Sequence, residues 1–242
     1  MHRLSVCRTL LLLGKARSNR VTGFTLVELL VVMAIIAILI FAVSGSLTGV
    51  MHSYQLTSAG QNVIGQLALA RQTALTSNHA VQVRFYQLPD YNQSSTSTPS
   101  VFRGLQSFKE GDLPANGSST TVPLSALSQP IFFTAPAIGS TNINSSSILN
   151  QTAITPSSTT GTTDVALPNY TYNYKYIAIR FQAGGSIQIM TSAGTTALPS
   201  TSNTLTFLLK SDKIVDPTNG LSANYLTLTI DPVTGTIQTF RP

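Results

Sequence analysis

The chain is poor in the residues that supply redox, metal-binding and nucleophilic chemistry. Its 242 residues include one cysteine, three histidines and no tryptophan, and only 9% of them are charged. The single cysteine is Cys7, so a chain that loses its first residues has no thiol, no disulfide and no cysteine-based metal site. His52 and His79 lie far apart, and neither a His-Glu-x-x-His motif nor a phosphate-binding loop occurs. We therefore expect a protein that is not an enzyme, with no catalytic residues, no cofactor and no metal site.

Three polar residues near the carboxyl terminus, Asp212, Asp216 and Asn219, lie close together in the sequence. Their spacing does not match the ligand spacing of an EF-hand calcium loop. The segment Asp216-Pro217-Thr218-Asn219-Gly220 is instead typical of a turn. We favour the turn over a calcium site.

Acidic residues are absent from the first 23 residues, which hold five Lys and Arg. The rest of the chain has nine Lys and Arg against eight Asp and Glu, so it accounts for only +1 of the formal net charge of +6. The basic character therefore belongs to a leader, residues 1–23, which positive charge should hold on the cytoplasmic side of a membrane. A nearly neutral remainder does not favour nucleic-acid binding.

An apolar run covers residues 24–43, interrupted only by Thr25 and Glu28. A helix of this length rises about 30 Å, which matches the hydrocarbon core of a bilayer. We expect residues 24–43 to span a membrane. A lone carboxylate in such a segment is costly and usually has a functional reason.

Proline is absent before Pro89, so nothing in the sequence breaks a helix that continues past the apolar run. Residues 44–78 alternate polar and apolar positions at helical spacing, with four glycines that weaken the helix. The apolar positions of this amphipathic half predict a stripe that packs on a domain: Leu56, Val63, Leu67, Ala70 and Ala74. We expect one helix from Phe24 to Asn78.

Residues 79–242 show period-two alternation and short turns, which predict an antiparallel β domain. Together with the long helix, this domain gives an α+β fold class. Gly184-Gly185 and Asp231 to Gly235 are expected to close hairpins. Two stretches rich in Ser, Thr and Asn, 91–100 and 139–164, are expected to be long surface loops. Strands are expected at 81–86, 101–108, 131–134, 174–181, 186–190, 204–209, 225–230 and 236–240.

The tyrosines at 170, 172, 174 and 176 are spaced by two, so a strand would place them on one face. That face would be a packed or half-exposed face of the sheet, with a binding or subunit-contact surface as the alternative.

The segment Gly23-Phe24-Thr25-Leu26-Val27-Glu28, followed by the apolar run, resembles the class III signal of type IV pilins and type II secretion pseudopilins. The resemblance implies that a prepilin peptidase cuts between Gly23 and Phe24 and then methylates the amino group of Phe24. It implies a pilin fold, in which a long amino-terminal helix packs on the β domain. It also implies an inner-membrane protein with a cytoplasmic amino terminus and a periplasmic domain, which joins other subunits in a filament. Glu28 matches the acid of the family, and pairing with the Phe24 amine of a neighbouring subunit would compensate its charge and set the stagger between subunits.

Shorter matches resemble the minor pseudopilin H and FimT-type group: 67–74, 81–85, 181–186 and 234–237. The signal also resembles the cassette of pilin-like proteins known from Verrucomicrobia (the Verru/Chthon cassette). A minor component of a pseudopilus or a type IV pilus is the function we favour. Two alternatives stay open, a FimT-like DNA-binding minor pilin and a membrane-anchored domain that never assembles.

Overall fold

The computed structural model describes residues 24–112, 122–156, 167–170, 173–198, 203–210 and 213–242, without the side chains of residues 42–48. The chain divides into two compact units, Met1–Ser46 and Leu47–Pro242. The leader, including Gly23, lies outside the described residues. In the described part of the chain, the structure is α+β, as the sequence predicts, and fits a pilin-like fold in broad terms.

The helix α1 comprises Leu26–Ser77 and contributes residues to both units. Its first residue lies two positions after the expected start, and it ends one residue before Asn78. Asn78 adopts φ 53°, a left-handed conformation that often terminates helices and that asparagine tolerates better than most residues. The long, proline-free helix expected from the sequence is thereby confirmed.

The rest of the described carboxy-terminal unit consists of antiparallel strands and the turns and loops between them. The strands are β1 (Val81–Leu88), β2 (Val101–Glu110), β3 (Leu124–Ala126), β4 (Ile131–Phe132), β5 (Ala137–Gly139), β6 (Lys175–Phe181), β7 (Ile187–Thr191), β8 (Gly194–Ala197), β9 (Thr204–Leu209), β10 (Ile214–Asp216), β11 (Leu221–Ser222), β12 (Tyr225–Ile230) and β13 (Ile237–Phe240). All eight predicted strands are found. The strands at 204–209 and 225–230 have the predicted bounds, the other six differ at one or both ends, and the one at 131–134 shrinks to two residues. The sequence analysis missed β3, β5, β8, β10 and β11, which are short and carry too few residues for a clear period.

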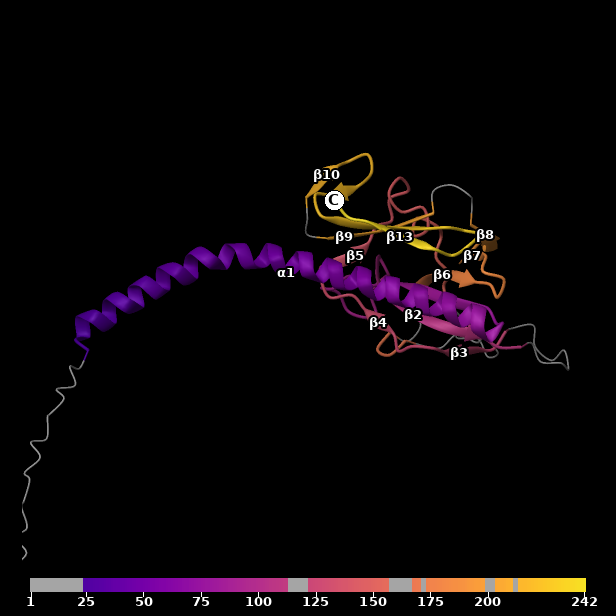
Figure 1. The fold of residues 1–242 in the computed structure, drawn as a ribbon, viewed down its shortest axis with the longest axis horizontal. Coiled ribbons are helices and arrows are strands. Elements are labelled where there is room, and N and C mark those ends of the chain that lie inside the picture. The colour runs from indigo at the N-terminus through magenta and orange to yellow at the C-terminus, as the bar shows by residue number, and fades with distance from the viewer. Residues whose placement is uncertain (1–23, 113–121, 157–166, 171–172, 199–202, 211–212) are drawn as a thin grey trace, which may run out of the picture. The chain divides into compact units, whose positions relative to one another are not determined.

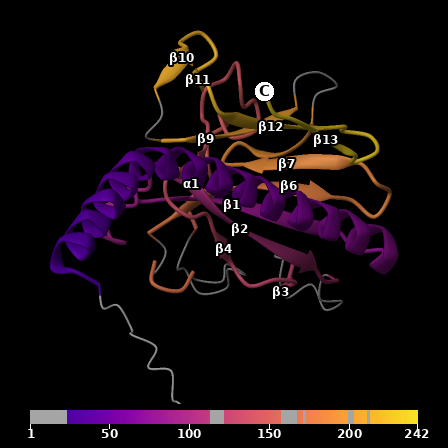
Figure 2. The same ribbon diagram turned by 60° about the vertical axis from the view of Figure 1, so that its left-hand side comes forward.

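The main sheet has the order β13-β12-β9-β5-β2-β1-β6-β7-β8, with β3 and β4 also paired to β2. Figures 1 and 2 show β10 and β11 as a separate hairpin at one end of this sheet. Both predicted hairpins are confirmed, because β6 pairs with β7 and β12 with β13. Their turns place Gly185 at φ 91° and Gly235 at φ 71°, where a side chain would be strained.

The carboxy-terminal half of α1 lies across one face of the sheet (Figure 2). All five residues of the predicted apolar stripe have 0% exposure, which confirms the stripe. They share one core cluster with residues of β1, β6, β9 and β12. Gly60 lies on the same buried side, and a Cβ built there would come within 1.9 Å of the Leu226 Cδ2. The helix and β12 thus approach closely here, and any side chain at position 60 requires Leu226 to move.

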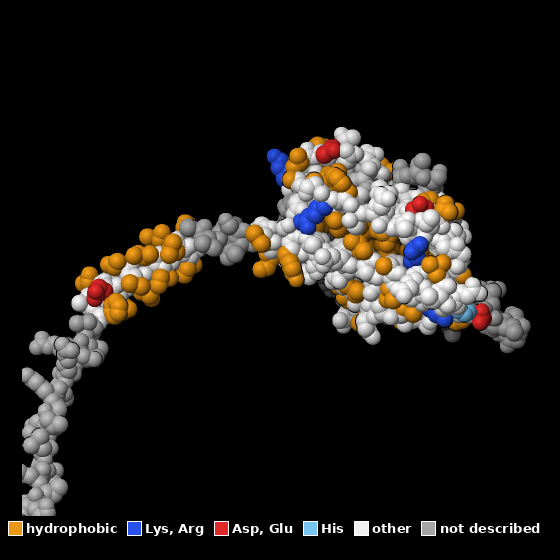
Figure 3. Space-filling model, viewed as in Figure 1, with side chains coloured by type: hydrophobic (Ala, Val, Ile, Leu, Met, Phe, Trp, Pro, Cys, Tyr) orange, Lys and Arg blue, Asp and Glu red, His pale blue; other side chains and the backbone are white. Residues whose placement is uncertain are grey.

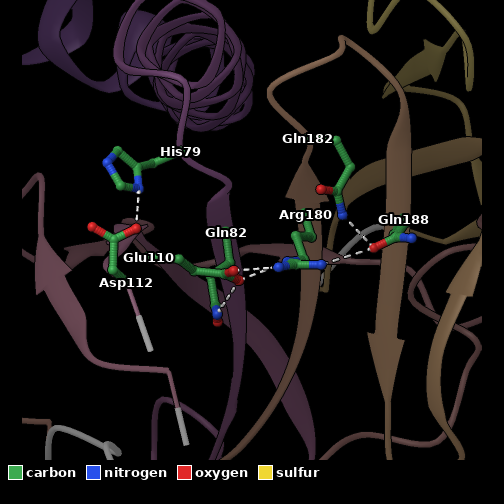
Figure 4. A network of polar contacts seen from close by, with 7 residues as sticks. All are labelled: His79, Gln82, Glu110, Asp112, Arg180, Gln182 and Gln188. Carbon is green, nitrogen blue, oxygen red and sulfur yellow. Dashed lines mark hydrogen bonds and ion pairs between the residues drawn. The ribbon is translucent and has the colours of Figure 1, made fainter. Parts of the chain in front are cut away.

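The other face of the sheet carries a polar network, drawn in Figure 4. Glu110 accepts hydrogen bonds from Gln82 Nε2 at 2.9 Å and Arg180 Nε at 2.7 Å, and Arg180 Nη2 forms an ion pair with it. Arg180 also donates to Gln188 Oε1 at 3.1 Å. Arg180 thereby links β2 to β7 across β1 and β6. The charges are compensated, which is what a buried carboxylate requires.

The tyrosine expectation is partly wrong. β6 begins at Lys175, and Tyr170 lies in a turn, so a single strand does not align the series. Tyr174 and Tyr176 are buried and pack edge-on against Tyr86, with ring centroids 5.4 and 6.5 Å apart. The packed interpretation therefore holds for these two, and they do not form a binding surface. Tyr172 lies outside the described residues.

The expectation of a surface loop at 139–164 is also wrong over part of its length. Ser146, Ile148 and Leu149 are at most 1% exposed. Their turn runs alongside β9, where the backbone N–H of Thr206 donates to the Ser146 hydroxyl at 3.4 Å. Serine in this stretch is used to bond a neighbouring strand rather than water, which composition alone does not reveal. Residues 157–164 lie outside the described part of the chain.

Candidate functional site

The predicted processing site lies at the start of α1. Phe24 and Thr25 precede the helix, and Glu28 lies in its first turn. The side chain of Phe24 is 82% exposed. Gly23, the other residue of the predicted cleavage site, lies outside the described residues.

Thr25 and Glu28 cap the helix by reciprocal hydrogen bonds. The backbone N–H and the hydroxyl of Thr25 each donate to Glu28 Oε2 at 2.9 Å, and the Glu28 N–H donates to Thr25 Oγ1 at 3.2 Å. The backbone N–H of Leu29 donates to the Thr25 carbonyl at 3.2 Å. This is a capping box, in which a Thr-x-x-Glu sequence satisfies amide groups that the helix leaves without partners. The Thr-x-x-Glu spacing was visible in the sequence, but the sequence analysis did not use it.

The capping box determines how the acid is presented. It holds the carboxylate at the amino-terminal end of α1, where the helix dipole favours negative charge. In the described residues, both hydrogen bonds to the carboxylate go to Oε2, and Oε1 accepts none. The second oxygen is therefore available to a further donor, such as an amine.

Glu28 is surrounded by exposed apolar side chains. From Phe24 to Phe41 the large apolar residues are 44–83% exposed, and Figure 3 shows apolar side chains along the visible face of this part of α1. No helix in the described part of the chain is both long and apolar enough to cross a membrane. The membrane span at 24–43 stays a prediction.

The arginines outside the leader serve the fold of the domain. Arg84 is 3% exposed, and its Cζ lies 4.2 Å from the ring centroid of Tyr176 and 4.9 Å from that of Phe108. Each of the five makes at least one hydrogen bond inside the described chain: Arg71, Arg84, Arg103, Arg180 and Arg241. Arginines held this way are poorly placed to read bases or to follow a phosphate backbone.

The Asp216 segment forms the turn that its sequence predicts, between β10 and β11. Asp216 accepts hydrogen bonds from the backbone N–H of Thr218 at 3.1 Å and of Asn219 at 3.3 Å, and from the Asn219 amide group at 2.5 Å. The bonds from Asn219 and then Thr218 lower the pKa of Asp216 from its usual value. Within the described residues, no group of three or more His, Cys, Asp or Glu lies together as potential metal ligands.

Comparison with known protein families gives a match at the amino terminus of the chain. Residues 18–44 match the prokaryotic N-terminal methylation motif. No curated protein and no solved structure matches the chain. The motif supports a type IV pilin-like protein, a class whose members are typically structural rather than enzymatic. It implies processing by a prepilin peptidase, a membrane-anchored prepilin and assembly with other pilin subunits.

Proposed function

We propose that the chain is a structural prepilin-like subunit of a pilus or a type II secretion-like pseudopilus. The peptidase cuts between Gly23 and Phe24 and methylates Phe24. Residues 24–43 then hold the subunit in the inner membrane, with the β domain on the periplasmic side. As a minor component, close to the minor pseudopilin H group, the subunit enters a filament through contacts centred on Glu28.

The observation that carries this proposal is a carboxylate held at the start of an otherwise apolar, exposed helix. A charged residue in the centre of a bilayer costs about 2.5–3.5 kcal/mol on insertion scales. The capping box offsets part of this cost inside the chain, since it provides Glu28 Oε2 with two donors. The charge itself is not compensated by Thr25, which is neutral.

The amine released at Phe24 is the cation that cleavage supplies. Removal of residues 1–23 takes away five positive charges and leaves this single amine beside the apolar run. Pairing between the amine of one subunit and Glu28 Oε1 of another compensates both charges in a low-dielectric setting, where such a pair is strong. The pair forms at only one axial stagger, so it also sets the register of assembly.

Mass spectrometry of the mature amino terminus is the first test. Methyl-phenylalanine at residue 24 is the expected result. An intact leader, or a cut at another bond, would contradict the proposal.

Two Glu28 variants separate charge from helix capping. Glu28→Gln keeps a side chain that can close the capping box but removes the charge, whereas Glu28→Ala removes both. We expect both variants to insert into the membrane and to be absent from sheared filament fractions. Thr25→Val is the matched control, because it loses the capping hydroxyl and keeps the charge, and it should still be incorporated. Normal incorporation of Glu28→Gln would refute charge pairing.

A further inference from the structure

Two exposed apolar groups stand out in the carboxy-terminal unit. Val50, Met51 and Tyr54 on α1 are 59–73% exposed, and Ile214 and Val215 on β10 are 52% and 66% exposed. Neither group contributes to a core cluster of the domain. Exposed apolar residues that gather at one place usually mark a contact surface.

Arg241 ties the two groups to the same end of the domain. Its Nη2 donates to Ser53 Oγ at 2.7 Å and to Asn224 Oδ1 at 3.2 Å. Asn224 in turn accepts a hydrogen bond at its carbonyl from the Ser222 hydroxyl at 2.8 Å, and Ser222 lies opposite Ile214 in the β10–β11 ladder. The base of this hairpin therefore lies beside the first packed turns of α1. Figures 1 and 2 agree on this placement, and we refer to it as the Tyr54 end.

The opposite end of the domain provides a comparison. Leu75 and Val233 both lie within 3.9 Å of the Cβ position of Gly185, so the β12–β13 turn is next to the last turns of α1. Leu75 follows Tyr54 by 21 residues on the same helix, a rise of about 30 Å. Val233 is 72% exposed, much like Val215 at the Tyr54 end.

The length of the chain links the Tyr54 end to the apolar run. Val50 follows the last residue of the run, Val43, by seven positions. Seven residues rise about 10 Å as a helix and reach at most about 25 Å when extended. If residues 24–43 span the bilayer, Val50 therefore lies within about 25 Å of its surface, whatever the arrangement of the two units. Tyr54 follows about 6 Å further along α1.

The chemistry of the Tyr54 end suits the boundary between lipid and water. Tyrosine has an apolar ring and a polar hydroxyl, and it is enriched at this boundary. Lys213 precedes the apolar pair on β10 and is exposed. A cation next to apolar side chains favours anionic headgroups.

We propose that the Tyr54 end rests on the membrane surface before the subunit enters a filament. Val50 and Met51 are the residues of this end nearest the headgroups, and Ile214 and Val215 form a second contact beside them. Two contacts, rather than a single helix, limit how far the domain tilts over the membrane. This inference rests on the proposed function, because it requires residues 24–43 to be inserted.

Site-directed fluorescence tests this proposal on the full chain. The sequence has no tryptophan and only Cys7, so a Cys7→Ser background accepts one new cysteine for an environment-sensitive nitrobenzoxadiazole label. Val215→Cys reports on the Tyr54 end, and Val233→Cys is the matched control at the other end. Ile35→Cys reports on insertion of the apolar run. The proteins are reconstituted in vesicles of phosphatidylethanolamine and phosphatidylglycerol, with and without lipid carrying a nitroxide on its headgroup.

We expect the nitroxide lipid to cause a loss of fluorescence at position 215 and none at position 233. Equal quenching at the two positions would overturn the proposal. So would a signal at 215 that changes with protein density but not with nitroxide lipid, because a second copy would then cover the surface. If the label at 35 is quenched by aqueous iodide, the segment is not inserted and the proposed function itself fails.

Discussion

Gly60 is the residue at which the packing of α1 on the sheet can be tested most directly. It lies on the buried side of the helix, and an added Cβ would come within 1.9 Å of the Leu226 Cδ2. Gly65 lies on the same helix but is exposed, and an added Cβ there meets no atom within 4 Å. The variants Gly60→Ala and Gly65→Ala therefore differ mainly in whether the new Cβ contacts Leu226.

The magnitude follows from two opposing effects. Replacing glycine by alanine in a helix stabilises it by about 1 kcal/mol, and this gain applies at both positions. Overpacking a core costs about 1–3 kcal/mol. We expect Gly65→Ala to raise the free energy of unfolding by up to about 1 kcal/mol. The free energy of unfolding of the Gly60→Ala variant should be about 1–3 kcal/mol lower than that of Gly65→Ala, because only the alanine at position 60 contacts Leu226.

Urea unfolding of the purified chain in detergent micelles measures these differences. Near-ultraviolet circular dichroism of the tyrosines follows the β domain, since the chain has eight tyrosines and no tryptophan. Leu226→Ala removes the clashing methyl group, so in that background Gly60→Ala should become stabilising, like Gly65→Ala. If Gly60→Ala stabilises the unmodified chain as much as Gly65→Ala does, the close approach of α1 and β12 is not as described.

Three further predictions concern the β domain. Arg180→Met leaves the carboxylate of Glu110 buried without its cation, so it should lower the free energy of unfolding, measured with urea, by about 3 kcal/mol. Adding Glu110→Gln to Arg180→Met should recover part of this loss. If stability does not recover, the pairing of Glu110 with Arg180 is contradicted. Burial raises the pKa of Tyr91 from 10.0 to about 12. The stability that neutral Tyr91 contributes is therefore fully present below about pH 10 and is lost as the pH rises through about 12. Tyr91→Phe should flatten this decline in the free energy of unfolding, and an unchanged decline would exclude Tyr91 as its cause. Hydrogen bonds from the backbone N–H groups of Thr234 and then Val233 lower the pKa of Asp231. The stability that Asp231 contributes is therefore present above about pH 3.8 and is lost as the pH falls through the lowered pKa. In NMR, the amide resonances of Thr234 and Val233 should titrate below pH 3.8, and a midpoint at or above that value would contradict these bonds.

Much of the fold could be predicted because its signals are local. The helical stripe from Leu56 to Ala74 follows from spacing, and the absence of proline allows the helix to run unbroken. The hairpins at Gly185 and Gly235 follow from turn chemistry, since glycine accepts positive φ at little cost. The amino-terminal site follows from a contiguous motif, and Thr25 and Glu28 are close enough in sequence to meet within one turn.

Other features could not be predicted because they depend on which surfaces meet. The Ser146 turn has the composition of a solvent-exposed loop, yet it is buried because its hydroxyl bonds the backbone of β9. Tyr174 and Tyr176 had a spacing that suits either a core or a surface. Short strands such as β5 form only because longer neighbours, β2 and β9, present open edges to them.

The sequence by itself determined the amino-terminal motif, the basic character of the first 23 residues, the thiol-free domain and the two periodicities of helix and strand. These are properties of covalent order and short spacing, and they do not depend on the rest of the fold. Only the tertiary structure decided the strand order, the Glu110–Arg180 pair across 70 residues and the Arg241–Ser53 contact across 188 residues. Such contacts depend on which distant segments pack together, and the spacing of residues along the chain does not predict this packing.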